Sequence, residues 1–237
     1  MSQTSKDPSV TTPSALLVED EPQIRRFVRT ALEEEGWQVH ESSTLQRGLI
    51  DAGTRQPDLV ILDLGLPDGD GIDFIKDVRR WSNVPIIVLS ARVSEVEKIR
   101  ALDAGADDYL TKPFGIGELQ ARVRATLRRQ RQPGVDLSGI VQFGDVKIDM
   151  QARLVTKADA VVHLTPTEWG MLEMLVRNRG KLVGREELLK EVWGPAYAKE
   201  THYLRVYLAQ LRRKLEVDPS HPKHLLTEAG MGYRFQE

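Results

Sequence analysis

Short apolar runs alternate with longer amphipathic stretches through the first 131 residues. The longer stretches, such as QIRRFVRTALEEE and IGELQARVRATLRRQR, repeat their apolar residues at helical spacing. A strand followed by a helix, repeated along the chain, predicts a doubly wound α/β unit with a five-stranded parallel sheet. Gly36, Gly53 and Gly105 close three of the stretches and predict left-handed helix ends. The predicted strands are ALLV (15–18), WQVH (37–40), LVIL (59–62), PIIVL (85–89) and DYLT (108–111).

The pattern changes after residue 131. The turn-rich stretch QPGVDLSG (132–139) predicts a linker. Strand-like runs follow (IVQFGDVKID, ARLVTK, AVVHLT), then three helical stretches, then a hairpin-like end, LLTEAGMGYRF. Strands and helices grouped in blocks favour an α+β domain. We therefore expect a disordered tail (1–13), an α/β domain (14–131), the linker and an α+β domain (140–237).

Composition narrows the classes of protein. The 237 residues include no cysteine, which excludes a disulfide scaffold and a thiolate metal site. Residues 1–12 are polar and no apolar run is long enough to span a membrane, so we expect a cytoplasmic protein. Residues 1–139 carry a net charge of −4 and residues 140–237 a net charge of +2. A polyanionic partner is therefore more plausible for the second domain.

Chemically reactive residues follow the predicted parallel strands. In an open sheet, ligands bind outside the carboxyl ends of the strands. Several carboxylates at one edge repel each other unless a cation neutralises them, and oxygen-only donors suit Mg²⁺. A lysine and a hydroxyl nearby would hold a phosphoryl group, and an aspartate would be the nucleophile. The residues at these ends are Glu19, Asp20, Glu21, Asp63, Ser90, Thr111, Lys112 and Pro113.

Four motifs stand out in this part of the chain: VEDE, Asp63 at 43 residues after Asp20, Ser90-Ala91 and YLTKPF. Through these motifs, residues 14–130 resemble the receiver domain of two-component response regulators. The resemblance implies a flavodoxin-like fold and phosphorylation of Asp63 by a sensor histidine kinase. It implies a Mg²⁺ site in which Asp20 and Asp63 bind directly, Glu19 through water and Gly65 through its carbonyl. It also implies that Ser90 and Lys112 hold the phosphoryl oxygens, that Lys112–Pro113 is a cis peptide and that Tyr109 is a switch residue.

Each of these motifs taken alone is more often a charged strand end or a turn, and only their combination is specific. A phosphatase of the haloacid dehalogenase type also uses an aspartate nucleophile and Mg²⁺. That class places a second aspartate two residues after the first, where this chain has Gly65, so we expect no enzyme. Asp68 and Asp70 are interpreted as turn residues.

The stretch THYLRVYLAQLRRKL (201–215) predicts a helix with two different faces. Four leucines at +4, +3 and +4 spacing form a buried stripe, and polar residues lie opposite, as on a helix in the major groove. An arginine-rich face is more often simply solvated. With the preceding helices and the GYRF ending, residues 140–235 resemble the winged-helix effector domain of the OmpR/PhoB family. The candidate DNA-binding residues are His202, Arg205, Val206, Gln210, Arg212, Arg213 and Tyr233.

This resemblance implies a recognition helix at 200–215, a wing at 224–235 and a loop at 194–200 available to RNA polymerase. Ala229 stands where many wings carry arginine, so base contacts rest more on Gln210, Arg205 and Arg213. The segment HYLRVYLAQLRRKLE most resembles potassium-responsive members, which implies potassium-transport genes as targets.

Phosphorylation is expected to favour a homodimer on DNA with repeated half-sites. In the family, the face formed by the fourth helix, fifth strand and fifth helix pairs through ion pairs, and Lys98–Glu118 and Asp108–Arg122 fit that pattern. Scattered surface charges are the simpler interpretation of single pairs. A regulator that binds DNA without phosphorylation is the alternative. The candidate dimer residues are Lys98, Asp107, Asp108, Glu118 and Arg122.

Overall fold

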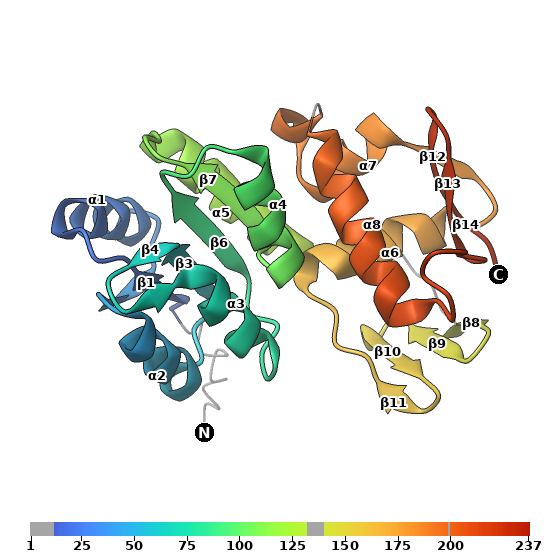
Figure 1. The fold of residues 1–237 in the computed structure, drawn as a ribbon, viewed down its shortest axis with the longest axis horizontal. Helices are drawn as coiled ribbons and strands as arrows, with labels where there is room; N and C mark the ends of the chain where they lie inside the picture. The colour runs from blue at the N-terminus through green and yellow to red at the C-terminus, as the bar shows by residue number, and fades with distance from the viewer. Residues whose placement is uncertain (1–11, 132–139, 199) are drawn as a thin grey trace, which may run out of the picture.

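The computed structural model describes residues 12–131, 140–198 and 200–237. The predicted linker and nearly all of the predicted tail lie outside these residues. The N-terminal domain holds a parallel five-stranded sheet in the order β2-β1-β3-β6-β7 (Figure 1). Its strands are β1 (Ser14–Val18), β2 (Gln38–Ser42), β3 (Leu59–Asp63), β6 (Ile86–Ser90) and β7 (Asp108–Thr111).

Helices cover both faces of this sheet. Alternate residues of each strand point to opposite faces, so the apolar runs are buried on both sides; all of β3 is buried. Leu17 and Ile61 pack toward α1 and α5, whereas Leu16 and Val60 pack toward the other helices. The helices are α1 (Pro22–Glu33), α2 (Leu45–Arg55), α3 (Gly71–Arg79), α4 (Glu95–Ala104) and α5 (Ile116–Arg131). The predicted α/β class and the alternation of strands and helices are confirmed.

Two of the three predicted glycine helix ends are confirmed. Gly36 and Gly105 have φ of +85° and +113°. The prediction for Gly53 is wrong, because α2 continues to Arg55 and Gln56 takes the left-handed conformation with φ of +48°. The loop after β3 also forms a small hairpin of β4 (Gly65–Leu66) and β5 (Gly69–Asp70), which the apolar pattern did not predict.

The C-terminal domain begins with an antiparallel sheet and continues as helices and a terminal hairpin (Figure 1). In the stretch 160–165, where we expected a strand, only Ala160–Val161 (β11) forms one. Thr165 precedes α6 and caps its start through a reciprocal capping box with Glu168. The elements are β8 (Ile140–Phe143), β9 (Val146–Asp149), β10 (Leu154–Lys157), β11 (Ala160–Val161), α6 (Pro166–Arg177), β12 (Leu182–Gly184), α7 (Arg185–Val192), the 3₁₀ turn η1 (Pro195–Tyr197), α8 (Thr201–Leu215), β13 (Leu225–Glu228) and β14 (Gly232–Phe235).

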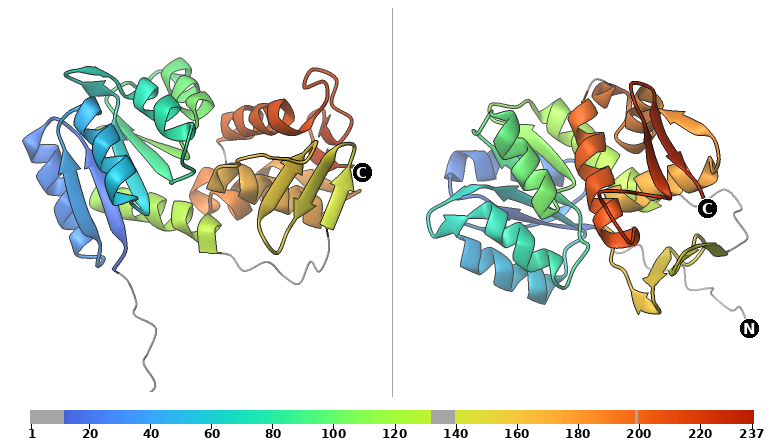
Figure 2. Two further views of the ribbon diagram at one scale, coloured as in Figure 1. Left: turned by 90° about the horizontal axis from the view of Figure 1, so that it is seen from below. Right: turned by 45° about the vertical axis from the view of Figure 1, so that its right-hand side comes forward.

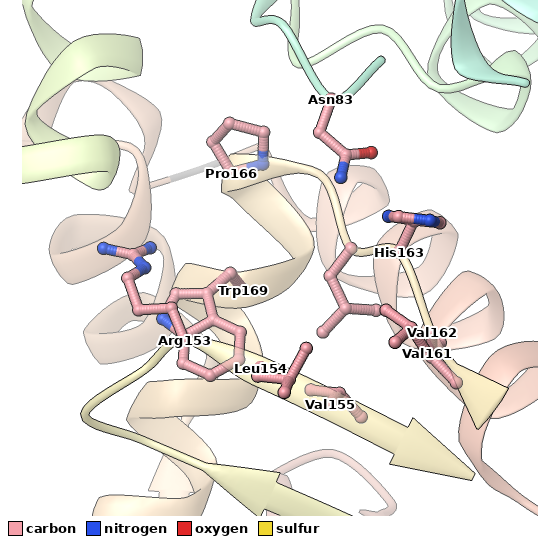
Figure 3. Close-up of a pocket in the computed structure, with 10 residues that line it drawn as sticks. Asn83, Arg153, Leu154, Val155, Val161, Val162, His163, Pro166 and Trp169 are labelled. Carbon is pink, nitrogen blue, oxygen red and sulfur yellow. The ribbon is translucent and has the colours of Figure 1, made fainter. Parts of the chain in front are cut away.

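The two domains are packed against each other. Helix α8 lies along α4, and α6 contacts α5, which Figures 1 and 2 show from three sides. One cluster of buried apolar side chains runs from the sheet and α4 of the N-terminal domain into the C-terminal domain. A cavity of about 340 Å³ lies between β10 and β11 of the first antiparallel sheet and Asn83 of the N-terminal domain (Figure 3). Arg153 lies over the Trp169 ring at the wall of this cavity.

Among the described residues, no helix combines the length and the apolar character that crossing a membrane requires.

Candidate functional site

Three carboxylates meet at the carboxyl edge of the parallel sheet. Asp63 is the last residue of β3, and Glu19 and Asp20 follow β1. Each offers an oxygen within 4.8 Å of the others, and Glu19 is fully buried. The sequence therefore identified the residues that converge here. Their chemical roles remain predictions.

Lys112 balances part of this negative charge. Its Nζ lies 2.8 Å from Glu19 Oε2 and 3.2 Å from Asp63 Oδ1. Burial would lower the pKa of Lys112, but the hydrogen bond to Glu19 and the charge of Asp63 outweigh it and raise the pKa. Burial raises the pKa of Glu19, with Lys112 opposing. The Lys112–Pro113 peptide is cis, as predicted.

Two residues that the sequence did not single out shape the loops of the site. Arg25 of α1 donates from Nη1 to the carbonyl oxygens of Glu19 and Asp20, at 2.7 Å each. Gly71 begins α3 so close to β3 that a Cβ would lie 2.5 Å from the Asp63 carbonyl oxygen. Only glycine permits this approach. Gly71 could have been singled out from the sequence because it directly follows the PDGD turn. Nothing in the sequence indicated the role of Arg25.

Ser90 and Tyr109 lie next to the carboxylates. Ser90 ends β6, is nearly buried, and accepts a hydrogen bond at its Oγ from the Arg92 N–H at 3.1 Å. The Tyr109 ring is buried already, and its hydroxyl donates to the Arg92 carbonyl oxygen at 2.6 Å. Burial raises the pKa of Tyr109. The switching role of Tyr109 remains a prediction.

The two aspartates of the PDGDG turn have structural partners. Asp68 accepts from the N–H groups of Leu45 and Gln46 at the start of α2, and these bonds lower its pKa. Asp70 caps α3 and pairs with Arg92. Both do more than form the turn, since Asp68 ties the loop to the start of α2 and Asp70 ties it to Arg92 in the loop between β6 and α4.

Helix α8 buries more than its leucine stripe. Leu204, Leu208, Leu211 and Leu215 are buried as predicted. A second stripe, Tyr203, Tyr207 and Gln210, at spacing +4 and +3, is buried against the N-terminal domain. The missed signal for this second packing surface was a pair of tyrosines one turn apart, between the leucine stripe and the predicted polar face.

The candidate DNA-binding residues occupy different environments. Arg205 and Arg213 are exposed, His202 is half-buried, and Val206 and Tyr233 are buried. Arg213 pairs with Asp103 of α4 at 3.0 Å. Arg212 donates to the Leu225 carbonyl oxygen at 2.8 Å and so ties α8 to the terminal hairpin. Of the candidates, Arg205 presents a cation to solvent most directly.

The candidate dimer residues all make contacts within this chain. Asp108–Arg122 forms as an intrachain pair at 3.0 Å, and Glu118 pairs with the same arginine. Lys98 pairs with Glu200 of the C-terminal domain, not with Glu118. Asp107 is buried against Arg79. The prediction that this face forms a dimer is not tested by these contacts.

Both halves of the chain match known families. Residues 15–124 match the response regulator receiver domain, and residues 159–235 match the C-terminal domain of transcriptional regulatory proteins. The chain belongs to the two-component response regulators of the OmpR/PhoB type, which are DNA-binding transcriptional regulators and not enzymes. It is 58% identical over 222 residues to the KDP operon transcriptional regulatory protein KdpE of Escherichia coli (strain K12), covering 94% of this chain and 98% of that protein.

Solved structures resemble the whole chain to different degrees. A single-site mutant of RitR, 28% identical, aligns with a TM-score of 0.78 over 95% of this chain and 99% of its own. DrrB of Thermotoga maritima, an OmpR/PhoB homologue with 29% identity, covers 96% of this chain and 100% of its own at a TM-score of 0.52. Because both comparisons span both domains, the higher score indicates that RitR also shares the way the domains are arranged.

Proposed function

We propose that this protein is a transcription factor activated by phosphorylation of Asp63, with a sensor histidine kinase as the phosphoryl donor, in the cytoplasm. The observation that carries the proposal is the convergence of Glu19, Asp20, Asp63 and Lys112 at one edge of the sheet. An Asp63 oxygen would form a bond to phosphorus as the bond between phosphorus and the kinase histidine breaks. The proposed domains are 14–131 and 140–237, with 132–139 as linker.

The donor atoms at this edge fit Mg²⁺. They are carboxylate oxygens only, within 4.8 Å of one another, and the carbonyl of Gly65 follows Asp63 by two residues. Asp20, Asp63 and Gly65 would bind directly and Glu19 through water. Bound Mg²⁺ supplies positive charge to the phosphoryl oxygens. Lys112, now shared by Glu19 and Asp63, would hold one phosphoryl oxygen and Ser90 another.

The DNA target is proposed from the similarity to the KDP operon regulator of E. coli. We expect the promoter of a corresponding operon for potassium transport to contain repeated half-sites. Phosphorylation would promote pairing of two receivers through α4, β7 and α5, and α8 of each subunit would then enter a major groove. The loop at 194–200, of which residue 199 lies outside the described part, would face RNA polymerase.

Phosphorylation and its metal requirement can be tested together. Acetyl phosphate with Mg²⁺ is expected to add one phosphoryl group, detected by intact mass spectrometry, and to raise both dimer content and promoter affinity. Chelation of Mg²⁺ by EDTA should prevent all three changes, because the clustered carboxylates then repel the incoming anion. Full phosphorylation in EDTA would contradict the metal assignment. Equal DNA affinity with and without phosphorylation would favour the phosphorylation-independent alternative.

Arg205 is predicted to contribute directly to DNA binding. Arg205→Ala is expected to weaken promoter binding of the activated protein by about 1–3 kcal/mol. The slope of log affinity against log salt concentration should become shallower by about one, as expected when one phosphate contact is lost. Fluorescence anisotropy at several salt concentrations measures both. The control is Arg80→Ala, which removes an exposed arginine just after α3. An unchanged affinity for Arg205→Ala would place the DNA interface elsewhere.

A further inference from the structure

The receiver face that is proposed to pair in the active dimer is covered by the chain's own effector domain. Lys98 pairs with Glu200 at 3.1 Å and lies over the Tyr203 ring. Asp107 accepts a hydrogen bond from the Thr167 hydroxyl of α6 at 2.9 Å. The ion pairs of this face are therefore used within one chain.

Asp108, the first residue of β7, is at the centre of this contact. Its carboxylate is fully buried. It accepts hydrogen bonds from the hydroxyl groups of Tyr203, at 3.0 Å, and Tyr197, and it pairs with Arg122 at 3.0 Å. Burial, and then the Asp108 charge, raises the pKa of the Tyr203 hydroxyl, so the phenol keeps its proton as a donor. Two effector tyrosines thus satisfy one receiver carboxylate, which would be costly to bury alone.

The recognition helix is held along most of its length. The Tyr207 hydroxyl donates to the carbonyl oxygen of Ala106. Gln210 donates to the carbonyl oxygen of Leu102 at 2.7 Å. One turn further, Arg213 meets Asp103. From Tyr203 to Arg213, α8 therefore has receiver atoms beside it.

This packing is incompatible with DNA binding by α8. An α-helix with its side chains is about 10–12 Å across, and the major groove is about 12 Å wide. A groove of that width accepts one helix and not a second helix packed alongside it. The arrangement that the structure shares with RitR thus withholds α8 from DNA and the α4–β7–α5 face from a second copy at the same time.

We propose that Asp108 with Tyr197 and Tyr203 forms a latch that holds the unphosphorylated protein in a closed, DNA-incompetent monomer. The proposal rests on the proposed function and adds how the inactive state is maintained. Opening frees Asp108 and Arg122 for a second receiver, so the latch and the dimer compete for one carboxylate.

The latch lies close to the phosphoacceptor site through the backbone. Asp108 and Tyr109 are consecutive residues of β7, and Tyr109 reaches the Arg92 carbonyl oxygen. The Arg92 N–H in turn bonds to Ser90. A displacement of Ser90 toward a phosphoryl group would therefore act on β7 at the residue next to the latch.

The test uses full-length protein in an Asp63→Asn background, where phosphorylation cannot contribute. Tyr203→Phe and Asp108→Asn are each expected to tighten promoter binding about tenfold, because each removes a hydrogen bond of a buried charge and raises the open fraction. The double variant should bind about as tightly as the tighter single variant, because both changes remove one interaction. Asp77→Asn, which removes an exposed ion pair on α3, is the control and should bind unchanged.

Small-angle scattering supplies a second measurement that needs no DNA. Both latch variants should be more extended than the Asp63→Asn parent, and circular dichroism should show unchanged secondary structure. Unchanged compactness and affinity in both variants would overturn the latch. Tighter binding by Tyr203→Phe alone would also overturn it, because the effect would then arise at the DNA contact. If the variants are more extended but no form of the protein binds the promoter, the latch proposal stands and the proposed DNA target is rejected.

Discussion

Asp63→Asn is expected to abolish phosphoryl transfer from acetyl phosphate and, with it, the Mg²⁺-dependent gain in DNA affinity. An amide cannot form the aspartyl phosphate, and it removes one of the three carboxylates that lie within 4.8 Å of each other. Intact mass spectrometry measures the modification and anisotropy measures the affinity. The control is Asp73→Asn, because Asp73 is an exposed aspartate of α3 that pairs with Lys76. Equal phosphorylation of Asp63→Asn would move the acceptor to another residue.

The Asp63→Asn variant also tests metal binding at this site, independently of phosphoryl transfer. Asp63 repels Glu19 and attracts Lys112, so its replacement has opposing effects and the Tm without metal is expected to change little. In wild-type protein, Mg²⁺ should raise the Tm by binding the folded state, and this increase should be largely lost in Asp63→Asn. Differential scanning fluorimetry with and without Mg²⁺ measures both. An equal Mg²⁺ effect in the variant would mean that the ion binds elsewhere.

Gly232→Ala is expected to destabilise the C-terminal domain by about 3 kcal/mol and to abolish promoter binding. A Cβ at Gly232 would lie 2.0 Å from the Val183 carbonyl oxygen, which belongs to the backbone of the paired strand β12 and cannot rotate away. The terminal hairpin would have to separate from β12, and with it the proposed wing. Scanning calorimetry should show a lower transition for this domain.

Gly170→Ala is the matched control for this prediction. Gly170 lies inside α6, and its added Cβ would make an ordinary contact at 3.6 Å with Val192. Alanine favours a helix interior over glycine, so this change should stabilise the domain by up to about 1 kcal/mol. Similar destabilisation by both substitutions would contradict the steric explanation for Gly232.

The convergence of the carboxylates and Lys112 at the sheet edge was predictable because local pattern and topology are sufficient for it. Apolar runs define the strands, and parallel strands bring their carboxyl ends to one edge, so Glu19, Asp63 and Lys112 had to meet. Arg25 and Asp68 were not predictable in the same way. Arg25 lies on α1 and Asp68 in the loop after β3, and their partners lie outside those segments. A charged side chain carries no sign of which distant backbone group it will satisfy.

Helix ends were predicted less reliably than helices. Gly105 ends α4 as expected, but α2 continues past Gly53 and ends at Gln56. Glycine only lowers the cost of a left-handed ending. Helix α2 passes Gly53 and stops before Pro57, which has no N–H to continue the helix.

The amino-acid pattern of this chain was sufficient to indicate a five-stranded α/β domain, an α+β domain and the reactive edge with Asp63. These features follow from side-chain periodicity and from the direction of the strands, which act within each domain. Only the tertiary structure decided that α8 buries a second stripe, Tyr203, Tyr207 and Gln210, against α4. That contact depends on how two separate surfaces fit together, and the hydrogen bonds of Tyr197 and Tyr203 to Asp108 join residues 89 and 95 positions apart, which no local pattern encodes.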